Sequence, residues 1–147
     1  PSYQSFTYDN FRFILLYNSD NYLGMDQDQL KWLSDELDKA KQEQAKGIYV
    51  FTHEPLFHPS SDHVMGRVES SLKQQAKSLI HTFKDNGVNK VFYGDIHYFT
   101  EYVEPETNFS MVTVGAVTSQ RNTQAPRYGL VTVFEDGTTR VEDVEIQ

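Results

Sequence analysis

The order of apolar and amphipathic segments constrains the fold of this chain more than any other feature. Short runs of branched and aromatic residues at 11–17, 48–52 and 90–93 have the length of buried strands. Two helical segments, at 26–44 and 68–85, lie between these runs, and each repeats apolar residues at steps of three and four. A strand–helix–strand order joins parallel strands, so the sequence predicts a parallel sheet covered by helices.

The two ends of the chain follow a different pattern. A first strand at 3–8 is separated from the run at 11–17 by the turn signal Asp9-Asn10. After His97 only strands are expected, and Asp136-Gly137 forms a hairpin turn between the last two; these strands lie at 98–103, 109–114, 128–134 and 139–146. We therefore expect an α/β (α+β) fold, with a mixed sheet followed by antiparallel strands, in one domain spanning residues 1–147.

Charge and composition exclude several functions. The chain of 147 residues has 13 basic and 21 acidic side chains, a net charge of −8, and is therefore a poor non-specific binder of nucleic acid. No apolar run approaches the length of a membrane span. The absence of cysteine excludes disulfides, cysteine zinc sites and cysteine nucleophiles, but it leaves the cellular compartment open.

Three polar residues stand where chemistry is expected in an open α/β sheet. His53 follows the run at 48–52, and Asp95 and His97 follow the run at 90–93. If these strands are neighbours, the three side chains converge at the carboxyl edge of the sheet, where such folds bind ligands. Imidazole and carboxylate suit zinc, iron or manganese. Hydrogen-bonded structural histidines are the alternative, and spacing alone leaves both open.

The sequence around these residues resembles the calcineurin-like metallophosphoesterases, most closely their purple-acid-phosphatase and cyclic-nucleotide-phosphodiesterase-like branches. Thr52-His53-Glu54-Pro55-Leu56-Phe57 is similar to their strand–His–x–Pro–Leu–aromatic block. Gly94-Asp95-Ile96-His97 is similar to their closing Gly-His-x-His block. The helical segment containing Gln29-Leu30-Lys31-Trp32-Leu33 and the strand at 11–16 resemble the elements that precede the His-Pro strand. The four blocks occur in the family's order.

The resemblance implies a four-layer αββα sandwich and a site for two divalent or trivalent metal ions, with Mn, Fe or Zn as candidates. It assigns His97 to the first metal and His53 to the second. Asp95 stands where the family has a second-metal histidine, so that site either takes a harder ion or is weakened. The implied reaction is hydrolysis of a phosphomonoester or phosphodiester by a metal-bound hydroxide. Three further residues of the loop at 54–66 would border the substrate pocket: Glu54, His58 and His63.

Blocks that the family places earlier are absent from this sequence. No Asp-x-His precedes His53, and neither Gly-Asn-His nor an upstream Gly-Asp-x-x-Asp/Tyr block occurs. We therefore expect the chain to be the C-terminal half of a metallophosphoesterase, inactive alone, with the N-terminal half as its partner. The exposed sheet edges of such a half favour self-association. A degenerate, non-catalytic domain used for binding or scaffolding is the alternative, and an unrelated β-rich binding module is a third.

Overall fold

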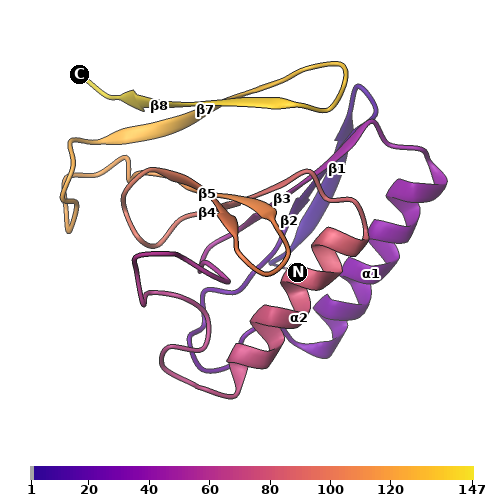
Figure 1. Ribbon diagram of the computed structural model, residues 1–147, viewed down its shortest axis with the longest axis horizontal. Coiled ribbons are helices and arrows are strands. Elements are labelled where there is room, and N and C mark those ends of the chain that lie inside the picture. Colours follow the sequence, from indigo (N-terminus) through magenta and orange to yellow (C-terminus); the bar gives the residue numbers. More distant parts are fainter. Residues whose placement is uncertain (1) are drawn as a thin grey trace.

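The computed structural model describes residues 2–147 and contains two sheets and two helices (Figure 1). The larger sheet has the strand order β1-β2-β3-β4-β6-β5. Its centre is parallel, from β2 to β6, and its two edge strands are antiparallel to their neighbours. The strands of this sheet are β1 (Gln4–Tyr8), β2 (Phe11–Leu15), β3 (Gly47–Thr52), β4 (Lys90–Tyr93), β5 (Thr100–Glu104) and β6 (Phe109–Thr113).

The two helices cover one face of the large sheet (Figure 1). Helix α1 (Gln27–Gln42) and helix α2 (Leu72–Asp85) each turn an apolar stripe toward the strands. Leu37 of α1 and Phe83 of α2 are almost completely buried, and they join Ile14, Val50 and Val91 in the main hydrophobic core. This core fixes the helical face of the sheet.

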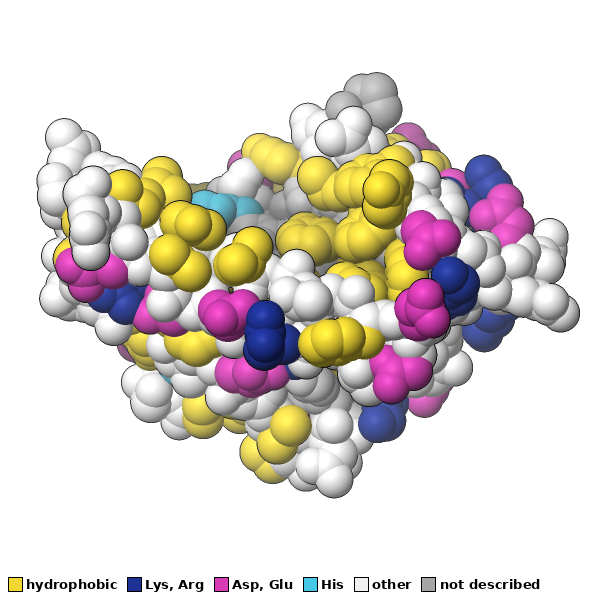
Figure 2. All heavy atoms as spheres, turned by 90° about the horizontal axis from the view of Figure 1, so that it is seen from above, with side chains coloured by type: hydrophobic (Ala, Val, Ile, Leu, Met, Phe, Trp, Pro, Cys, Tyr) yellow, Lys and Arg dark blue, Asp and Glu magenta, His cyan; other side chains and the backbone are white. Residues whose placement is uncertain are grey.

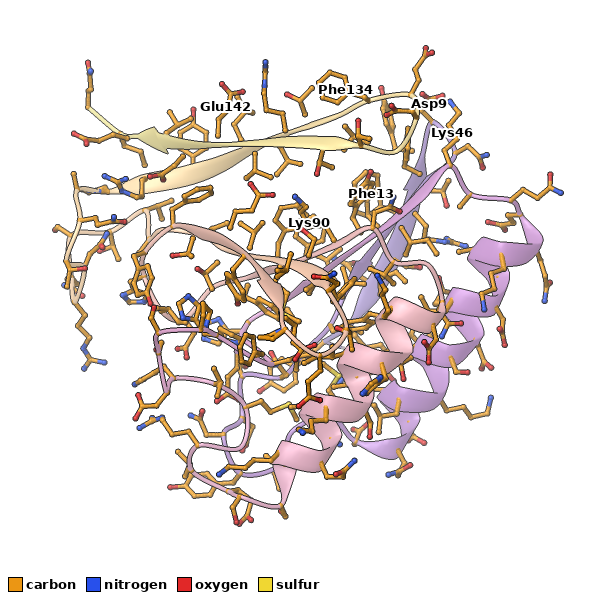
Figure 3. The ribbon with its side chains drawn as sticks, in the orientation of Figure 1. Asp9, Phe13, Lys46, Lys90, Phe134 and Glu142 are labelled. Carbon is orange, nitrogen blue, oxygen red and sulfur yellow. The ribbon has the colours of Figure 1, made fainter. Side chains whose placement is uncertain are left out.

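A hairpin covers part of the opposite face. Strands β7 (Arg127–Val133) and β8 (Thr139–Glu145) pair with each other and form a separate two-stranded sheet above the first (Figure 1). Phe13 and Lys90 lie in the layer between the large sheet and this hairpin (Figure 3). The Tyr49 hydroxyl donates a 2.7 Å hydrogen bond to the carbonyl oxygen of Gly137 in the hairpin turn. Side chains and this hydrogen bond therefore hold the hairpin in place.

The face toward the hairpin is aromatic and only partly covered. Phe51 and Phe92 stack with ring centroids 5.0 Å apart, as do Phe6 and Phe13. Phe6 is 51% exposed and Tyr8 is 74% exposed, because β1 lies at the edge beyond the main core. Figure 2, seen from the hairpin side, shows hydrophobic side chains gathered beside a hollow.

The predicted fold class is confirmed, with an α/β core followed by antiparallel strands. Helix α2 begins at Leu72, four residues later than the expected start at Val68. Gly66 has φ +91, and the Glu69 carboxylate accepts a hydrogen bond from the Ser71 backbone N–H, so turns occupy the intervening residues. Among residues 2–147, no helix has the length and apolar character needed to cross a membrane.

Candidate functional site

The candidate site lies where β3 and β4 end. These strands are parallel neighbours with Thr52 opposite Tyr93, so His53 and Gly94 leave the sheet side by side. The Gly94 N–H donates a 3.0 Å hydrogen bond to the His53 carbonyl oxygen, which extends the pairing by one residue. Strand register therefore brings His53 next to the segment that contains Asp95, as the sequence predicts.

A buried asparagine holds the turn that carries His53. Asn18 is 0% exposed and follows β2, the neighbour of β3. Its side-chain oxygen accepts hydrogen bonds from the backbone N–H groups of His53 and Glu54, each 2.9 Å long, and from the Thr52 hydroxyl. Its amide nitrogen donates a 2.7 Å hydrogen bond to the Glu54 carbonyl oxygen. Sequence reasoning missed this residue, because an asparagine in a polar segment after a strand is typical of any loop.

Asp95 lies between two histidines. Its Oδ1 is 3.6 Å from His53 Nε2, and its Oδ2 is 3.4 Å from His63 Nδ1. The side chains of His53 and His63 are about half exposed and that of Asp95 is 26% exposed, so the cluster is open to water. His63 belongs to the histidine loop, our name for residues 54–66. The sequence placed His63 only at the border of a substrate pocket, because the loop has no periodicity that fixes its path.

His97 is turned away from this cluster. Its Nδ1 lies 3.1 Å from the carbonyl oxygen of Arg121, and no ion pair joins it to Asp95 in the described part of the chain. Asp95 has φ +61 and His97 has φ +64, a left-handed conformation that is uncommon for residues other than glycine. Asp95 and His97 share this conformation with the hairpin-turn pair Asp9 and Asn10, so it reflects a tight turn after β4.

Two further polar residues of the histidine loop are buried. Glu54 is 4% exposed, and its Oε2 has no hydrogen-bond partner within residues 2–147. Burial raises the pKa of the Glu54 carboxyl and the charge of Asp95 raises it further, while Arg67 and His63 act in the opposite direction. Burial lowers the pKa of His58, whose ring contacts Tyr98 and Tyr102 edge-on. Glu54 therefore lies within electrostatic reach of Asp95, whereas His58 is packed among aromatic rings.

The imidazole nitrogens and carboxylate oxygens around Asp95 are donor types that bind metal ions, but they are too few to form a complete site. Two ligands on one tetrahedral ion, each about 2.1 Å from it, lie roughly 3.4 Å apart. The separations from Asp95 to His53 and His63 are close to this value. Residues 2–147 nevertheless contain no group of three or more His, Cys, Asp or Glu side chains that could hold an ion. These residues therefore fit a metal in part, with further donors needed.

Comparison with solved structures decides the fold type. A purple acid phosphatase from yellow lupin (Lupinus luteus) seeds matches with a TM-score of 0.58 at 19% identity, over 88% of this chain and 27% of its own. The chain has the metallophosphoesterase fold. A Staphylococcus aureus protein provisionally described as a 5′-nucleotidase matches with a TM-score of 0.52 at 14% identity, over 98% of this chain and 28% of its own.

Comparisons by sequence add no closer relative. No protein-family model and no curated protein matches the chain. The chain spans slightly more than a quarter of the length of each of the two solved structures, at 27% and 28%. The two structural matches confirm the metallophosphoesterase-type fold that the histidine-containing blocks predict. They do not establish the activity or the metal content of this chain.

Proposed function

We propose that this chain is the C-terminal part of a metal-dependent phosphoesterase that hydrolyses phosphomonoesters or phosphodiesters. One observation carries the proposal: His53 and Asp95 follow the ends of adjacent parallel strands in a metallophosphoesterase-type fold, with Nε2 and Oδ1 3.6 Å apart. In this fold class the carboxyl ends of the strands are where ligands gather. The lupin phosphatase and the staphylococcal protein provisionally described as a nucleotidase share this fold, which supports phosphate-ester chemistry.

His53, Asp95 and His63 are the residues of this chain that would contribute donor atoms to a metal site, and further ligands would be needed to complete it. A bound ion supplies Lewis-acid polarisation of the phosphoryl group and a nucleophile at neutral pH. The chain's own contribution is positional: strand register fixes His53 and Asp95, and the histidine loop brings His63 to the second oxygen of Asp95. His97 remains a candidate ligand if its ring rotates away from the Arg121 carbonyl oxygen.

The remaining ligands would come from a preceding segment that forms the N-terminal half of the same domain. Two observations support this assignment. The donor set around Asp95 is short of a complete site. The aromatic face beside the hairpin is also open, with Phe6 51% and Tyr8 74% exposed. Covering such a face with a second sheet would complete the four-layer sandwich, whereas the uncovered face favours self-association.

The gene gives the first test. We expect about 150 codons before that of Pro1, one domain's worth, to contain Asp-x-His, Gly-Asp-x-x-Asp/Tyr and Gly-Asn-His-Asp/Glu in frame and in that order. A reading frame that starts at or near Pro1, or one without these blocks, would contradict the proposal that this chain completes a catalytic domain.

The full gene product gives the second test. We expect it to hydrolyse p-nitrophenyl phosphate or bis-p-nitrophenyl phosphate with Mn, Fe or Zn, and the 147-residue chain alone to lack this activity. His53→Ala and Asp95→Ala should lower kcat at least tenfold, while Asp38→Ala, an exposed carboxylate of α1, should not. Equal rates in all three variants would exclude these residues from the site.

A non-catalytic domain that binds or scaffolds is the second candidate. It is favoured by Asp95 in the place of a histidine and by the contact of His97 with the Arg121 carbonyl oxygen. Asp95→His separates the two possibilities in the full gene product. Raised metal content or rate would mean that the natural site is a weakened catalytic one. Unchanged metal content and no hydrolysis by any variant would favour the scaffold.

A further inference from the structure

A cavity of about 450 Å³ lies on the helical side of the molecule, between the histidine loop, α2 and the β5–β6 turn. We call it the α2 cavity. Its apolar lining includes Leu56, Met65, Ala76 and Ile80, each no more than 5% exposed. A volume of this size is typical of small-molecule sites, and an apolar lining binds the hydrophobic part of a ligand. The lining excludes His53 and Asp95, so the α2 cavity is distinct from the candidate metal site.

The acidic groups on the turn side of the α2 cavity are already engaged. The Glu104 carboxylate accepts hydrogen bonds from the backbone N–H groups of Glu106 and Thr107 and from the Thr107 hydroxyl. Glu106 forms an ion pair with Lys77 at 3.5 Å. These carboxylates therefore have partners within the protein and need no cation from a ligand.

The basic groups on the opposite side are not engaged in this way. Arg67 follows the histidine loop and Lys73 lies in the first turn of α2, and both line the α2 cavity. Neither forms an ion pair within residues 2–147. Asp62 also lines the cavity and opposes them, and the charge of Arg67 acts on the buried Glu54 carboxyl. Lys73 is therefore the basic side chain on this side that has the fewest acidic neighbours, and Arg67 adds a planar set of donors.

Backbone packing at Gly66 places the segments that carry Arg67 and Lys73 against each other. Gly66 has φ +91, and a Cβ placed on it would lie 2.7 Å from the backbone nitrogen of Lys73. The chain around Gly66 therefore rests on the first turn of α2, so the backbone of Arg67, the next residue, follows directly after this contact with Lys73. Only glycine permits this approach and this φ value without strain.

We propose that the α2 cavity binds an amphipathic anion, with its apolar chain on the buried floor and its carboxylate or phosphate head at Arg67 and Lys73. The guanidinium of Arg67 offers a planar pair of donors to either head group, and Lys73 adds a point charge. The cavity's volume equals that of about fifteen water molecules, which accommodates a chain of roughly eight carbons. This proposal does not depend on phosphoesterase activity.

Calorimetric titration of the 147-residue chain with four probes of equal chain length tests it. Octanoate and octyl phosphate should each bind saturably at one site, and octanol and octylammonium should bind at least tenfold more weakly. Comparison of the two anions shows which head group the site prefers. Absence of saturable binding by both anions, or equal binding of octanol, would overturn the proposal.

Variants assign the binding to the cavity. The double variant Arg67→Ala/Lys73→Ala should lower the affinity for the anions about tenfold and leave that for octanol unchanged. Lys84→Ala, a basic residue in the last turn of α2 outside the cavity, is the matched control. Ala76→Leu should block all four probes by filling the floor; if it fails to fold, the double variant still decides. Loss of octyl phosphate binding in Asp95→Ala, but not in the double variant, would place the ligand at the candidate metal site and overturn the proposal.

Discussion

Replacement of Asn18 by alanine tests whether this buried amide holds the turn that carries His53. The side chain accepts three hydrogen bonds and donates one, all to residues 52–54. Asn18 is 0% exposed, so its loss would leave two backbone N–H groups, one hydroxyl and one carbonyl oxygen without this partner. A buried polar group left unpaired costs about 1–3 kcal/mol.

The expected loss of stability depends on how many of these unpaired groups remain inaccessible to water in the variant. Water can reach the backbone near His53, whose side chain is about half exposed, whereas Thr52 and Glu54 are buried. With about two of the four groups left dry, Asn18→Ala should lower the free energy of unfolding by about 4 kcal/mol. At an m value of about 2 kcal/mol/M, the urea midpoint should fall by about 2 M.

Urea unfolding monitored by circular dichroism measures this shift in the midpoint, and Asn21→Ala is the control. Asn21 lies in the same loop and is exposed, so its replacement should change stability by less than about 0.5 kcal/mol.

Asn18→Asp keeps the accepting oxygen, and below a pH of about 3.9 its protonated second oxygen can donate to the Glu54 carbonyl. This variant should therefore lose stability as the pH rises through that value. An alanine variant within 1 kcal/mol of the natural protein would refute the reasoning.

Three further substitutions test the fold around the site. Gly66→Ala should lower the free energy of unfolding by more than about 1 kcal/mol in urea titrations, because φ is +91 and the added Cβ would meet Lys73. Burial lowers the pKa of His58, so the folded chain resists its protonation. The stability of the natural protein relative to His58→Phe should then fall as the pH drops below about 6.5, measured by thermal melts across pH. Phe83→Ala should cost about 3–5 kcal/mol in urea titrations, because Phe83 is 0% exposed and packs against Phe109.

Periodicity was sufficient to predict the core of the fold. Leu33 and Leu37 recur at helical spacing and are 2% and 1% exposed, and the continuous run at β3 is buried between two parallel neighbours. These patterns report local geometry and burial together, which is why they predicted the order of helices and strands. The start of α2 was placed too early, because the apolar stripe does not reveal the turn in which the Ser71 N–H donates a hydrogen bond to the Glu69 carboxylate.

The candidate site was only partly predictable. Adjacent parallel strands explain why His53 and Asp95 approach each other, and this follows from the order of elements. The direction of His97 depends on positive φ values at Asp95 and His97, which a two-residue spacing does not encode. His63 and Asn18 reach the site through loops, and loop paths are set by long-range hydrogen bonds that leave no periodic signal in the sequence.

The candidate site therefore combines a rigid part with a part that depends on the histidine loop. Strand register and Asn18 fix His53, whereas His63 depends on the closure of its loop. The Met65 N–H closes this loop by donating a 2.8 Å hydrogen bond to the Pro55 carbonyl oxygen, and its far end rests on α2 at Gly66. The same end of the loop borders the α2 cavity. A structural change at the cavity should therefore alter the distance from His63 to Asp95, whereas the distance from His53 to Asp95 is fixed by the sheet and should stay the same.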